Sequence, residues 1–299
     1  MTTAVPRISV VIPAFQEERG IAAVVREVRD VLGPEAEILV VDDGSSDGTT
    51  RAAQAAGARV LSHPYNIGNG AAVKTGLRAA QGDVVVLMDG DGQHAAQEIP
   101  RLVAALDRFD MAVAARTVGS RGRFHRSLAN RTYNALASYV CGRPIPDLTS
   151  GFRAMRTATV RRFVYLLPNT FSYPTTLTLA LFRAGHRVTF VPIEVRPRVG
   201  RSKIRLVQDG SRFLLIIVKI ATLYAPFRVF LPVSLLFFLA GAANYAYTYF
   251  TAGRFTNMSA LMFTNGVLVF LLSLIAEQIA QLRLDRTESD PQWERRRDP

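Results

Sequence analysis

Cysteine is almost absent from this sequence. Its 299 residues contain only Cys141, which excludes an internal disulfide and fits a reducing compartment. The first residues, MTTAVPRISVVIP, lack the charged segment and long apolar stretch of a signal peptide, so none is expected. The four histidines do not cluster with cysteine at the spacing of a zinc site. The sequence therefore predicts neither a disulfide framework nor a zinc-binding module.

Charge is missing from two long runs near the C-terminus. Residues 229–253 and 255–276 contain no Lys, Arg, Asp or Glu. Each run exceeds the roughly 20 residues that cross a bilayer as a helix. Arg254 alone separates them, which predicts a tight transmembrane hairpin, with a pair of buried core helices as the alternative. Glu277, just after the second run, is expected at the membrane interface.

Acidic residues are scarce in the middle of the chain. Residues 1–115 carry 10 Lys and Arg against 15 Asp and Glu, whereas residues 116–228 carry 20 against 3, a net charge of +17. A basic block directly before membrane spans would face anionic lipid headgroups. By the positive-inside rule, both termini and the domain before the hairpin are expected on the cytoplasmic side of the cell membrane. A nucleic acid is not the expected partner, because no nucleic-acid module is recognisable.

The first half of the chain alternates short apolar segments with amphipathic ones. Strands are expected at residues 7–13, 37–43, 58–63, 83–89 and 111–116, and helices at 18–32, 48–57 and 68–82. The first two strands are apolar throughout, which is typical of a parallel sheet covered on both faces. This rhythm predicts an open α/β sheet of the doubly wound, Rossmann-like type.

Polar clusters follow four of these strands. They read PAFQEE, DDGSSDGT, NIGNG and DGDGQH. In such sheets, ligands bind at the carboxyl ends of the strands, which share one edge. The glycine-rich loop NIGNGAAVK lacks the GKS/T ending of a Walker P-loop. Turns chosen independently would not all fall at one edge, so the sequence predicts a single binding site there.

Two carboxylates end the fourth expected strand. Asp89 and Asp91 in MDGDGQH are two residues apart, so they start on the same side of the strand. Carboxylates this close repel unless a positive charge lies between them or one of them holds a proton. Glycines at 90 and 92 allow a sharp turn and the close approach of a ligand. A hard divalent cation with oxygen ligands accounts for this pattern, and a merely polar turn is the alternative.

Five motifs together resemble a known family. PAFQEE, VVDDGSSDGT, NIGNGAAVKTG, MDGDGQH and DLTSGFR, in this order and spacing, resemble the family 2 glycosyltransferases of GT-A fold. More closely, they are similar to the polyprenyl-phosphate hexose synthases, the dolichol-phosphate mannose synthase group. The resemblance covers about residues 7–205 and continues into the hairpin. It implies inverting transfer of one hexose from GDP-mannose or UDP-glucose to a dolichyl or undecaprenyl phosphate, with Mg²⁺ or Mn²⁺.

The resemblance also implies roles for individual residues. Contacts to the nucleotide-sugar would come from Pro13, Phe15, Glu17, Val40, Asp42, Asp89, Gly90, Arg116, Arg198 and Lys203. The metal ligands would be Asp89, Asp91 and Gln93. The catalytic residues would be Asp91, Arg116, Arg131 and Arg153, the last two as contacts of the acceptor phosphate. His94, beside the site, is expected to support it or to be structural.

Two features depart from the family pattern or leave an alternative open. QHAAQEIP lacks the proline that often follows QH in the family, and Arg196 could take the role given to Arg198. Residues 116–131 contain five arginines and no acid, and a solvated loop that only attracts headgroups is the alternative to phosphate binding.

The expected organisation has four parts. Residues 1–202 form the catalytic domain, 203–228 interfacial amphipathic helices, 229–282 the transmembrane hairpin, and 283–299 a disordered cytoplasmic tail. Small residues at 241–243 permit close helix packing and would allow a homo-oligomer. Two other functions stay open. One is sugar transfer to another membrane lipid such as diacylglycerol, and the other is non-catalytic binding of a nucleotide-sugar.

Overall fold

The computed structural model describes residues 6–116, 124–169, 172–196, 222 and 225–288. The chain divides into two compact units. One consists of Met1–Ser138 with Arg143–Arg205, and the other of Tyr139–Gly142 with Leu206–Pro299. We describe the first as the sheet domain and the second as the hairpin unit.

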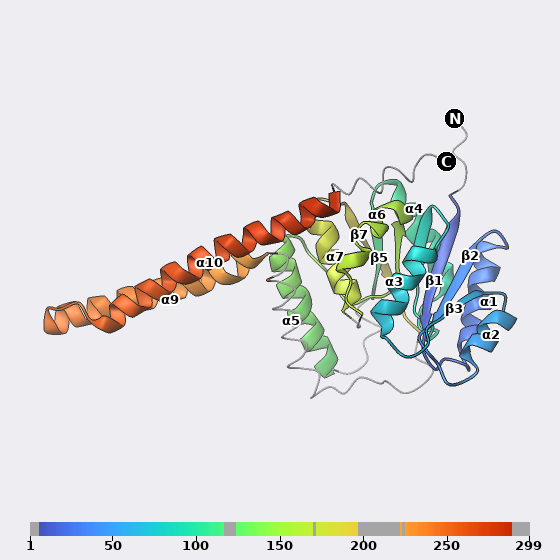
Figure 1. Cartoon of the computed structure of the whole chain (residues 1–299), viewed down its shortest axis with the longest axis horizontal. Coiled ribbons are helices and arrows are strands. Elements are labelled where there is room, and N and C mark those ends of the chain that lie inside the picture. Colours follow the sequence, from blue (N-terminus) through green and yellow to red (C-terminus); the bar gives the residue numbers. More distant parts are fainter. Residues whose placement is uncertain (1–5, 117–123, 170–171, 197–221, 223–224, 289–299) are drawn as a thin grey trace. The chain divides into compact units, whose positions relative to one another are not determined.

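The sheet domain is built on one seven-stranded sheet (Figure 1). Its strands are β1 (Ile8–Ala14), β2 (Glu37–Asp42), β3 (Arg59–Ser62), β4 (Val84–Leu87), β5 (Met111–Arg116), β6 (Arg153–Arg156) and β7 (Val188–Ile193). Their order across the sheet is β3-β2-β1-β4-β6-β5-β7. All neighbours pair in parallel except β6, which is antiparallel to both β4 and β5. The carboxyl ends of the parallel strands therefore share one edge, and β6 begins at that edge.

Helices cover both faces of the sheet. The helices of the sheet domain are α1 (Ile21–Leu32), α2 (Thr49–Ala55), α3 (Asn69–Ala79), α4 (Ile99–Ala104), α5 (Phe124–Cys141), α6 (Thr157–Arg161) and α7 (Tyr173–Arg183). The last three residues of α5 belong to the hairpin unit. Short 3₁₀ turns lie at Ala96–Glu98, Ala105–Asp107 and Val164–Leu166. On one face α3 lies close to β1, because a Cβ on Gly76 would be 2.2 Å from Cγ1 of Val11. Only glycine permits this approach.

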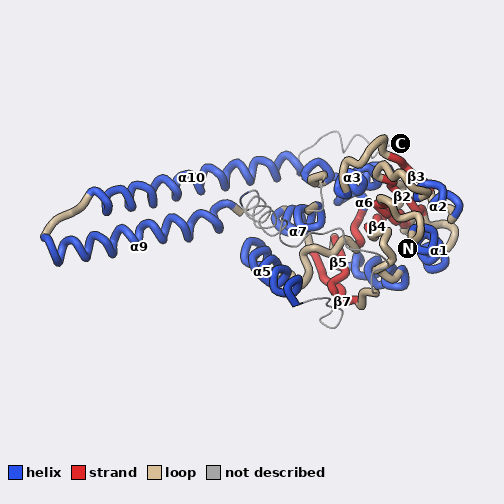
Figure 2. Tube along the Cα trace, turned by 90° about the horizontal axis from the view of Figure 1, so that it is seen from below, coloured by secondary structure: helices blue, strands red, loops and turns tan. Residues whose placement is uncertain are grey.

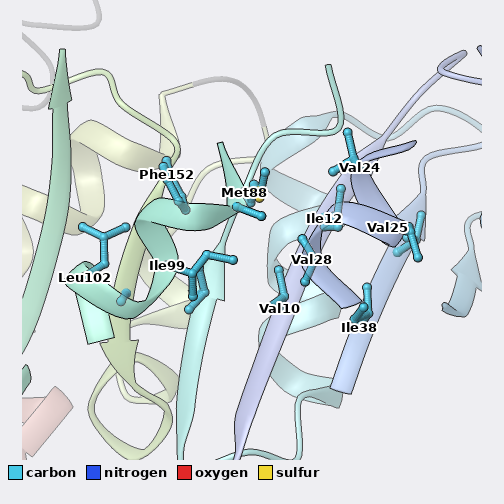
Figure 3. Close-up of a cluster of buried hydrophobic side chains, with 14 of the residues drawn as sticks. Val10, Ile12, Val24, Val25, Val28, Ile38, Met88, Ile99, Leu102 and Phe152 are labelled. Atoms are coloured by element: carbon cyan, nitrogen blue, oxygen red, sulfur yellow. The ribbon is translucent and has the colours of Figure 1, made fainter. Parts of the chain in front are cut away.

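The core follows from the alternation of side chains along the strands. Val10, Ile12 and Ala14 of β1 point to one face, where they meet the buried side of α1 (Figure 3). Figure 3 shows Val24, Val25 and Val28 of α1 directed at these strands, with Ile99 and Leu102 of α4 further along the same layer. These side chains are almost completely buried. The apolar spacing of 3 and 4 residues in α1 is what allows one helix face to cover two strands.

The expected sheet is confirmed, and the structure adds elements to it. All five expected strands and three expected helices are present with small shifts at their ends. β6 and β7 were not predicted. β6 has only four residues, RAMR, with arginine at both ends, so its sequence lacks the apolar run that identifies a buried strand.

The hairpin unit contains two long helices, α9 (Pro226–Ala252) and α10 (Asn257–Glu288). They run side by side in opposite directions and are joined by residues 253–256 (Figure 2). Gly253 ends α9 in the left-handed conformation, with φ of 62°, and its N–H bonds to the carbonyl of Tyr249. Both helices are long and apolar enough to cross a membrane, and their large apolar side chains are mostly exposed. The alternative of buried core helices does not fit this exposure.

The boundaries expected around the hairpin remain predictions. α9 begins at Pro226 and so includes the last three residues of the segment 203–228. Most of that segment, and the tail from residue 289, lie outside the described residues. Glu277 accepts a hydrogen bond from the N–H of Phe227 at 3.2 Å, and thus binds a backbone group that the first turn of α9 leaves unpaired.

Small and polar residues hold the two helices together. A Cβ on Gly241 would lie 3.2 Å from Met262 and Phe263, and one on Gly266 would lie 2.8 Å from the ring of Phe238. The hydroxyl of Ser234 donates to the carbonyl of Gly266 at 2.8 Å. Gly241, which we considered for oligomer contacts, is therefore used inside the hairpin.

Replacing Gly266 with leucine should push α9 and α10 apart, because the first side-chain carbon already meets the Phe238 ring. Overpacking of this kind costs about 1–3 kcal/mol. We expect the midpoint of thermal unfolding, followed by helicity in detergent, to fall by several degrees. The control Ala242→Leu adds leucine at an exposed position of the partner helix α9 and should leave the midpoint unchanged. Equal midpoints for the two variants would contradict the packing role of Gly266.

Candidate active site

The predicted motifs meet at one edge of the sheet. PAFQEE, DDGSSDGT and DGDGQH follow β1, β2 and β4, and Arg116 ends β5. DLTSGFR leads into β6, which begins at the same edge because it runs in the opposite direction. Arg153 pairs in register with Leu87 of β4, two residues before Asp89. The antiparallel strand therefore brings residues 147–153 beside the DGDG turn.

The DGDG turn presents two half-buried carboxylates, Asp89 and Asp91. Asp91 accepts the N–H of Gln93 through Oδ1 at 3.2 Å. Gly90 lies against β1, since a Cβ there would be 3.3 Å from the carbonyl oxygen of Pro13. Gly92 has φ of 71°, a conformation that glycine adopts without strain. The glycines thus turn the chain so that both carboxylates stay at the edge.

The carboxylates suit a divalent cation that shares its ligands with a substrate. Among the described residues there is no group of three or more His, Cys, Asp or Glu able to hold a metal alone. Asp89, Asp91 and the amide oxygen of Gln93 are hard oxygen ligands of the kind that Mg²⁺ and Mn²⁺ bind. Mg²⁺ commonly binds through one or two carboxylates and the phosphates of its substrate. The donor set therefore fits a metal held jointly by the protein and a diphosphate.

His94 lies under this turn rather than in solvent. Its side chain is stacked on Phe152, with ring centroids 5.0 Å apart and an interplanar angle of 13°. Burial lowers the pKa of His94, although the charges of Asp89 and Asp91 act in the opposite direction. Its buried Nδ1 has no hydrogen-bond partner within the part of the chain that is described. The expected supporting role is consistent with this packing.

Arg116 is held by a carboxylate that the sequence analysis did not single out. Its Nε and one terminal nitrogen donate to Asp147 at 2.7 and 2.9 Å, and the same terminal nitrogen donates to Thr149 at 2.7 Å. Burial alone would raise the pKa of Asp147, but the hydrogen bonds and charge of Arg116 hold it below its ordinary value. The hydrogen bonds to Asp147 in turn raise the pKa of Arg116. The motif DLTSGFR was recognised, but the partner of its aspartate could not be read from the sequence.

The loops after β1 and β2 are tied to each other. The N–H of Glu17 donates to the Thr49 hydroxyl at 2.9 Å, and the N–H of Gln16 donates to Ser45 at 2.9 Å. Asp42 accepts the N–H of Ser45 at 3.0 Å and the hydroxyl of Thr50. These bonds fix the loop that carries Phe15 and Glu17, the expected nucleoside contacts.

Asp43 links a third loop to this edge. It accepts the N–H groups of Ile67 and Gly68 at 3.0 and 2.8 Å, which holds the NIGNG loop. His63 contacts the same carboxylate through Nδ1 at 2.7 Å.

Two expected nucleoside contacts lie deeper than the edge. Pro13 is buried within β1, with its carbonyl against Gly90. Val40 is fully buried, and its side chain belongs to the apolar core shared with α1. The position of Val40 does not bring its side chain to the carboxyl edge.

The structure separates the arginines that were expected to contact phosphates. Arg131 is exposed on α5. Arg153 is completely buried, with a terminal nitrogen donating to the Pro174 carbonyl and the Thr178 hydroxyl, each at 3.1 Å. The expected contact of Arg153 with an acceptor phosphate does not fit this placement, because no part of its side chain reaches the surface.

The late basic motif begins at an anchored residue. The N–H of Arg196 donates to the carbonyl of Gln93 at 2.9 Å, and its guanidinium pairs with Glu27 at 2.9 and 3.0 Å. Arg196 therefore ties the end of the DGDGQH turn to Glu27 of α1. Arg198 and Lys203 lie outside the described residues.

Residues 9–163 match the family described as Glycosyl transferase family 2, and residues 225–282 match the GtrB C-terminal hairpin. The first match covers more than half of the chain and contains the strands and turns that build the carboxyl edge as far as β6.

Curated relatives are similar over the same region. An undecaprenyl-phosphate mannosyltransferase from Micrococcus luteus is 30% identical over 213 residues, which are 66% of this chain and 87% of the relative. An undecaprenyl-phosphate 4-deoxy-4-formamido-L-arabinose transferase from Edwardsiella ictaluri is 31% identical over 195 residues. That match covers 62% of this chain and about half, 54%, of the relative.

Solved structures share the fold of the sheet domain. A glucosyl-3-phosphoglycerate synthase from Mycobacterium tuberculosis, in complex with Mn²⁺, UDP and phosphoglyceric acid, has a TM-score of 0.59 and 25% identity. The match covers 72% of this chain and 78% of that one. The same enzyme in complex with Mg²⁺ and UDP gives a TM-score of 0.59 and 26% identity, over 72% and 79% of the two chains. The chain belongs to glycosyl transferase family 2, as a glycosyltransferase whose sheet domain is followed by a GtrB-type hairpin.

Proposed function

We propose that this protein transfers one hexose from a nucleotide-sugar to a polyprenyl phosphate at the cytoplasmic face of the membrane. The observation that carries the proposal is the Asp89/Asp91 pair at the carboxyl edge of a family 2 glycosyltransferase that also has a membrane-type hairpin. Two relatives named for undecaprenyl phosphate as acceptor support the choice of a lipid phosphate. GDP-mannose and UDP-glucose are the donors we propose.

The donor would lie across the carboxyl ends of β1, β2 and β4. Phe15, Glu17 and Asp42 come from the loops that would surround the nucleoside. Asp89, Asp91 and Gln93 would hold Mg²⁺ or Mn²⁺, which, when bound, offsets the negative charge of the diphosphate leaving group. Neighbours of the same fold bind Mn²⁺ or Mg²⁺ together with UDP, which supports this placement. Arg198 and Lys203 complete the proposal as contacts of the diphosphate.

The acceptor chemistry requires little proton transfer. A phosphate monoester has a second pKa of about 6, so it is largely a dianion near neutral pH. A phosphate oxygen would attack the anomeric carbon in line with the bond to the diphosphate, and the nucleoside diphosphate would leave with that bonding pair. This displacement inverts the anomeric configuration. Arg131, exposed on α5, and Arg116, at the end of β5, are the proposed contacts that hold the phosphates.

The hairpin would bring the enzyme to its lipid substrate. A helix of 27 residues such as α9 is about 40 Å long, enough to cross the apolar part of a bilayer. Arg228 lies at one end of the hairpin and Arg254 at its tip. The net charge of +17 in residues 116–228 favours the cytoplasmic side for the sheet domain. We propose two spans with both termini in the cytoplasm.

A transfer assay tests this proposal directly. Purified protein is supplied with undecaprenyl or dolichyl phosphate, Mg²⁺ or Mn²⁺, and radiolabelled GDP-mannose or UDP-glucose in separate reactions. We expect label in the lipid phase from one donor, with loss of at least about 100-fold in Asp91→Ala because a metal ligand is gone. Asp107→Asn, which changes an exposed carboxylate, is the matched control and should keep wild-type activity.

The same assay separates the other functions. Transfer to diacylglycerol and not to the lipid phosphate would contradict the proposed acceptor. Metal-dependent donor binding without transfer to any acceptor would contradict catalysis. Product that retains the anomeric configuration of the donor would contradict the single displacement.

The Arg116–Asp147 pair gives a pH-dependent prediction. Asp147→Asn replaces a charged hydrogen-bond acceptor by a neutral one, and we expect a loss of about 2 kcal/mol in the free energy of unfolding at pH 7. Because folding lowers the pKa of Asp147, its contribution is complete above the unfolded value of 3.8 and is lost as the pH falls through the folded value. The difference between variant and wild type should therefore shrink below about pH 4. Chemical unfolding at a series of pH values measures it, and a difference independent of pH would contradict the role of this charge.

A further inference from the structure

Gly151, Phe152 and Arg153 lie at the active edge, and the side chains of the last two point to opposite faces of the sheet. Successive residues of a strand point to opposite faces. Phe152 packs into the core on the α1 and α4 side (Figure 3). Its ring stacks on that of His94. Arg153 points to the other side, where it donates to residues of α7. Gly151, immediately before them, lies against the metal-binding turn.

The Asp89 carboxylate and the Tyr173 hydroxyl both lie close to Gly151. A Cβ built on Gly151 would lie 2.8 and 2.9 Å from the two carboxylate oxygens of Asp89 and 3.0 Å from the hydroxyl oxygen of Tyr173. The backbone of Gly151 is outside the left-handed region, so glycine is not needed there for its φ angle. Glycine is required at position 151 because the carboxylate and the phenol occupy the space that a Cβ would need.

Tyr173 is placed to act as a donor. It is the first residue of α7 and only 1% of its surface is exposed. A tyrosine hydroxyl ordinarily titrates with a pKa of about 10, so near neutral pH it carries a proton that it can donate. A protonated phenol beside a carboxylate can only be the donor of the pair.

Arg153 connects the segments that carry Gly151 and Tyr173. Besides Pro174 and Thr178, it donates to the carbonyl of Ser150, and so connects the loop before Gly151 to the first turns of α7. Burial lowers its pKa to about 10, and the charges of Asp147 and Asp89 oppose that shift, so it stays cationic near neutral pH.

We propose that Tyr173 is a positioning residue, whose hydroxyl donates to the Asp89 carboxylate and fixes it against Gly151 in the orientation that binds the metal of the nucleotide-sugar. This inference rests on the proposed function, in which Asp89 is a metal ligand. Ligating carboxylates are commonly oriented by hydrogen bonds from groups around them, and loss of such a partner weakens metal binding about 10–100-fold. A tyrosine that only fills the core would have no such effect.

The test measures metal binding without any lipid. Mn²⁺ affinity is determined by electron paramagnetic resonance of the free ion, on the full-length protein in detergent with GDP or UDP. We expect Tyr173→Phe, which keeps the ring and removes the hydroxyl, to raise the Kd of Mn²⁺ about 10-fold. The matched control is Tyr133→Phe, which removes a buried hydroxyl that bonds to Thr175 of the same helix at 2.8 Å. Its Mn²⁺ affinity should equal that of the wild type.

Two further variants address coupling and folding. In an Asp89→Asn background, Tyr173→Phe should cause no additional loss of affinity, because the carboxylate it positions is gone. Gly151→Ala should weaken Mn²⁺ at least as much as Tyr173→Phe, since its Cβ occupies the place of the carboxylate. This variant leaves Tyr173 in place and tests the arrangement even where Tyr173→Phe unfolds.

The outcomes distinguish this inference from the proposed function. Equal Mn²⁺ affinities of Tyr173→Phe, Tyr133→Phe and the wild type would overturn the role of Tyr173 and leave the proposed function intact. A further loss in the Asp89→Asn background would also overturn it, because Tyr173 would then act through another group. If the wild type binds no Mn²⁺ with either nucleotide, the metal-dependent function and the inference both fall.

Discussion

The reversed strand β6 determines which side chains meet at the active edge. It lies between β4 and β5 and runs against both, so the loop that precedes it reaches the edge where its neighbours end. Asp147, Gly151 and Arg153 come to lie around the DGDG turn for this reason. A parallel strand in the same place would end at this edge instead, and its preceding loop would lie on the opposite side of the sheet.

The parallel part of the fold and the paired carboxylates could be predicted from sequence because their signals are local. Apolar runs identify β1, β2 and β4, and DGDG identifies Asp89 and Asp91 within four residues. Contacts between distant segments could not be predicted. Tyr173 lies 84 positions after Asp89, and nothing in FSYPTT marks it. The resemblance to the family placed Arg153 against an acceptor phosphate, and its complete burial depends on contacts with α7 that no local pattern marks.

Polar groups in the interior of the sheet domain are mostly satisfied by neighbouring loops. Asp43 holds the NIGNG loop, Asp42 holds the turn after β2, and Glu27 holds both Arg196 and the N–H of Ala96. The turn after DGDGQH, where the proline typical of the family is missing, is therefore fixed by Glu27 instead. These bonds order the edge before a ligand arrives, which reduces the entropy lost on binding.

The four-residue connection between α9 and α10 has a consequence for how the protein enters a membrane. In the proposed two-span arrangement, a connection this short favours insertion of the two helices as one unit. The contacts at Gly241 and Gly266 would form before or during that insertion. The side-chain amide of Asn244 donates to the hydroxyls of Thr256 and Ser259, so it has polar partners within the hairpin. In that arrangement Arg254, the one charged residue between positions 229 and 276, would have to be carried to the far side at an electrostatic cost.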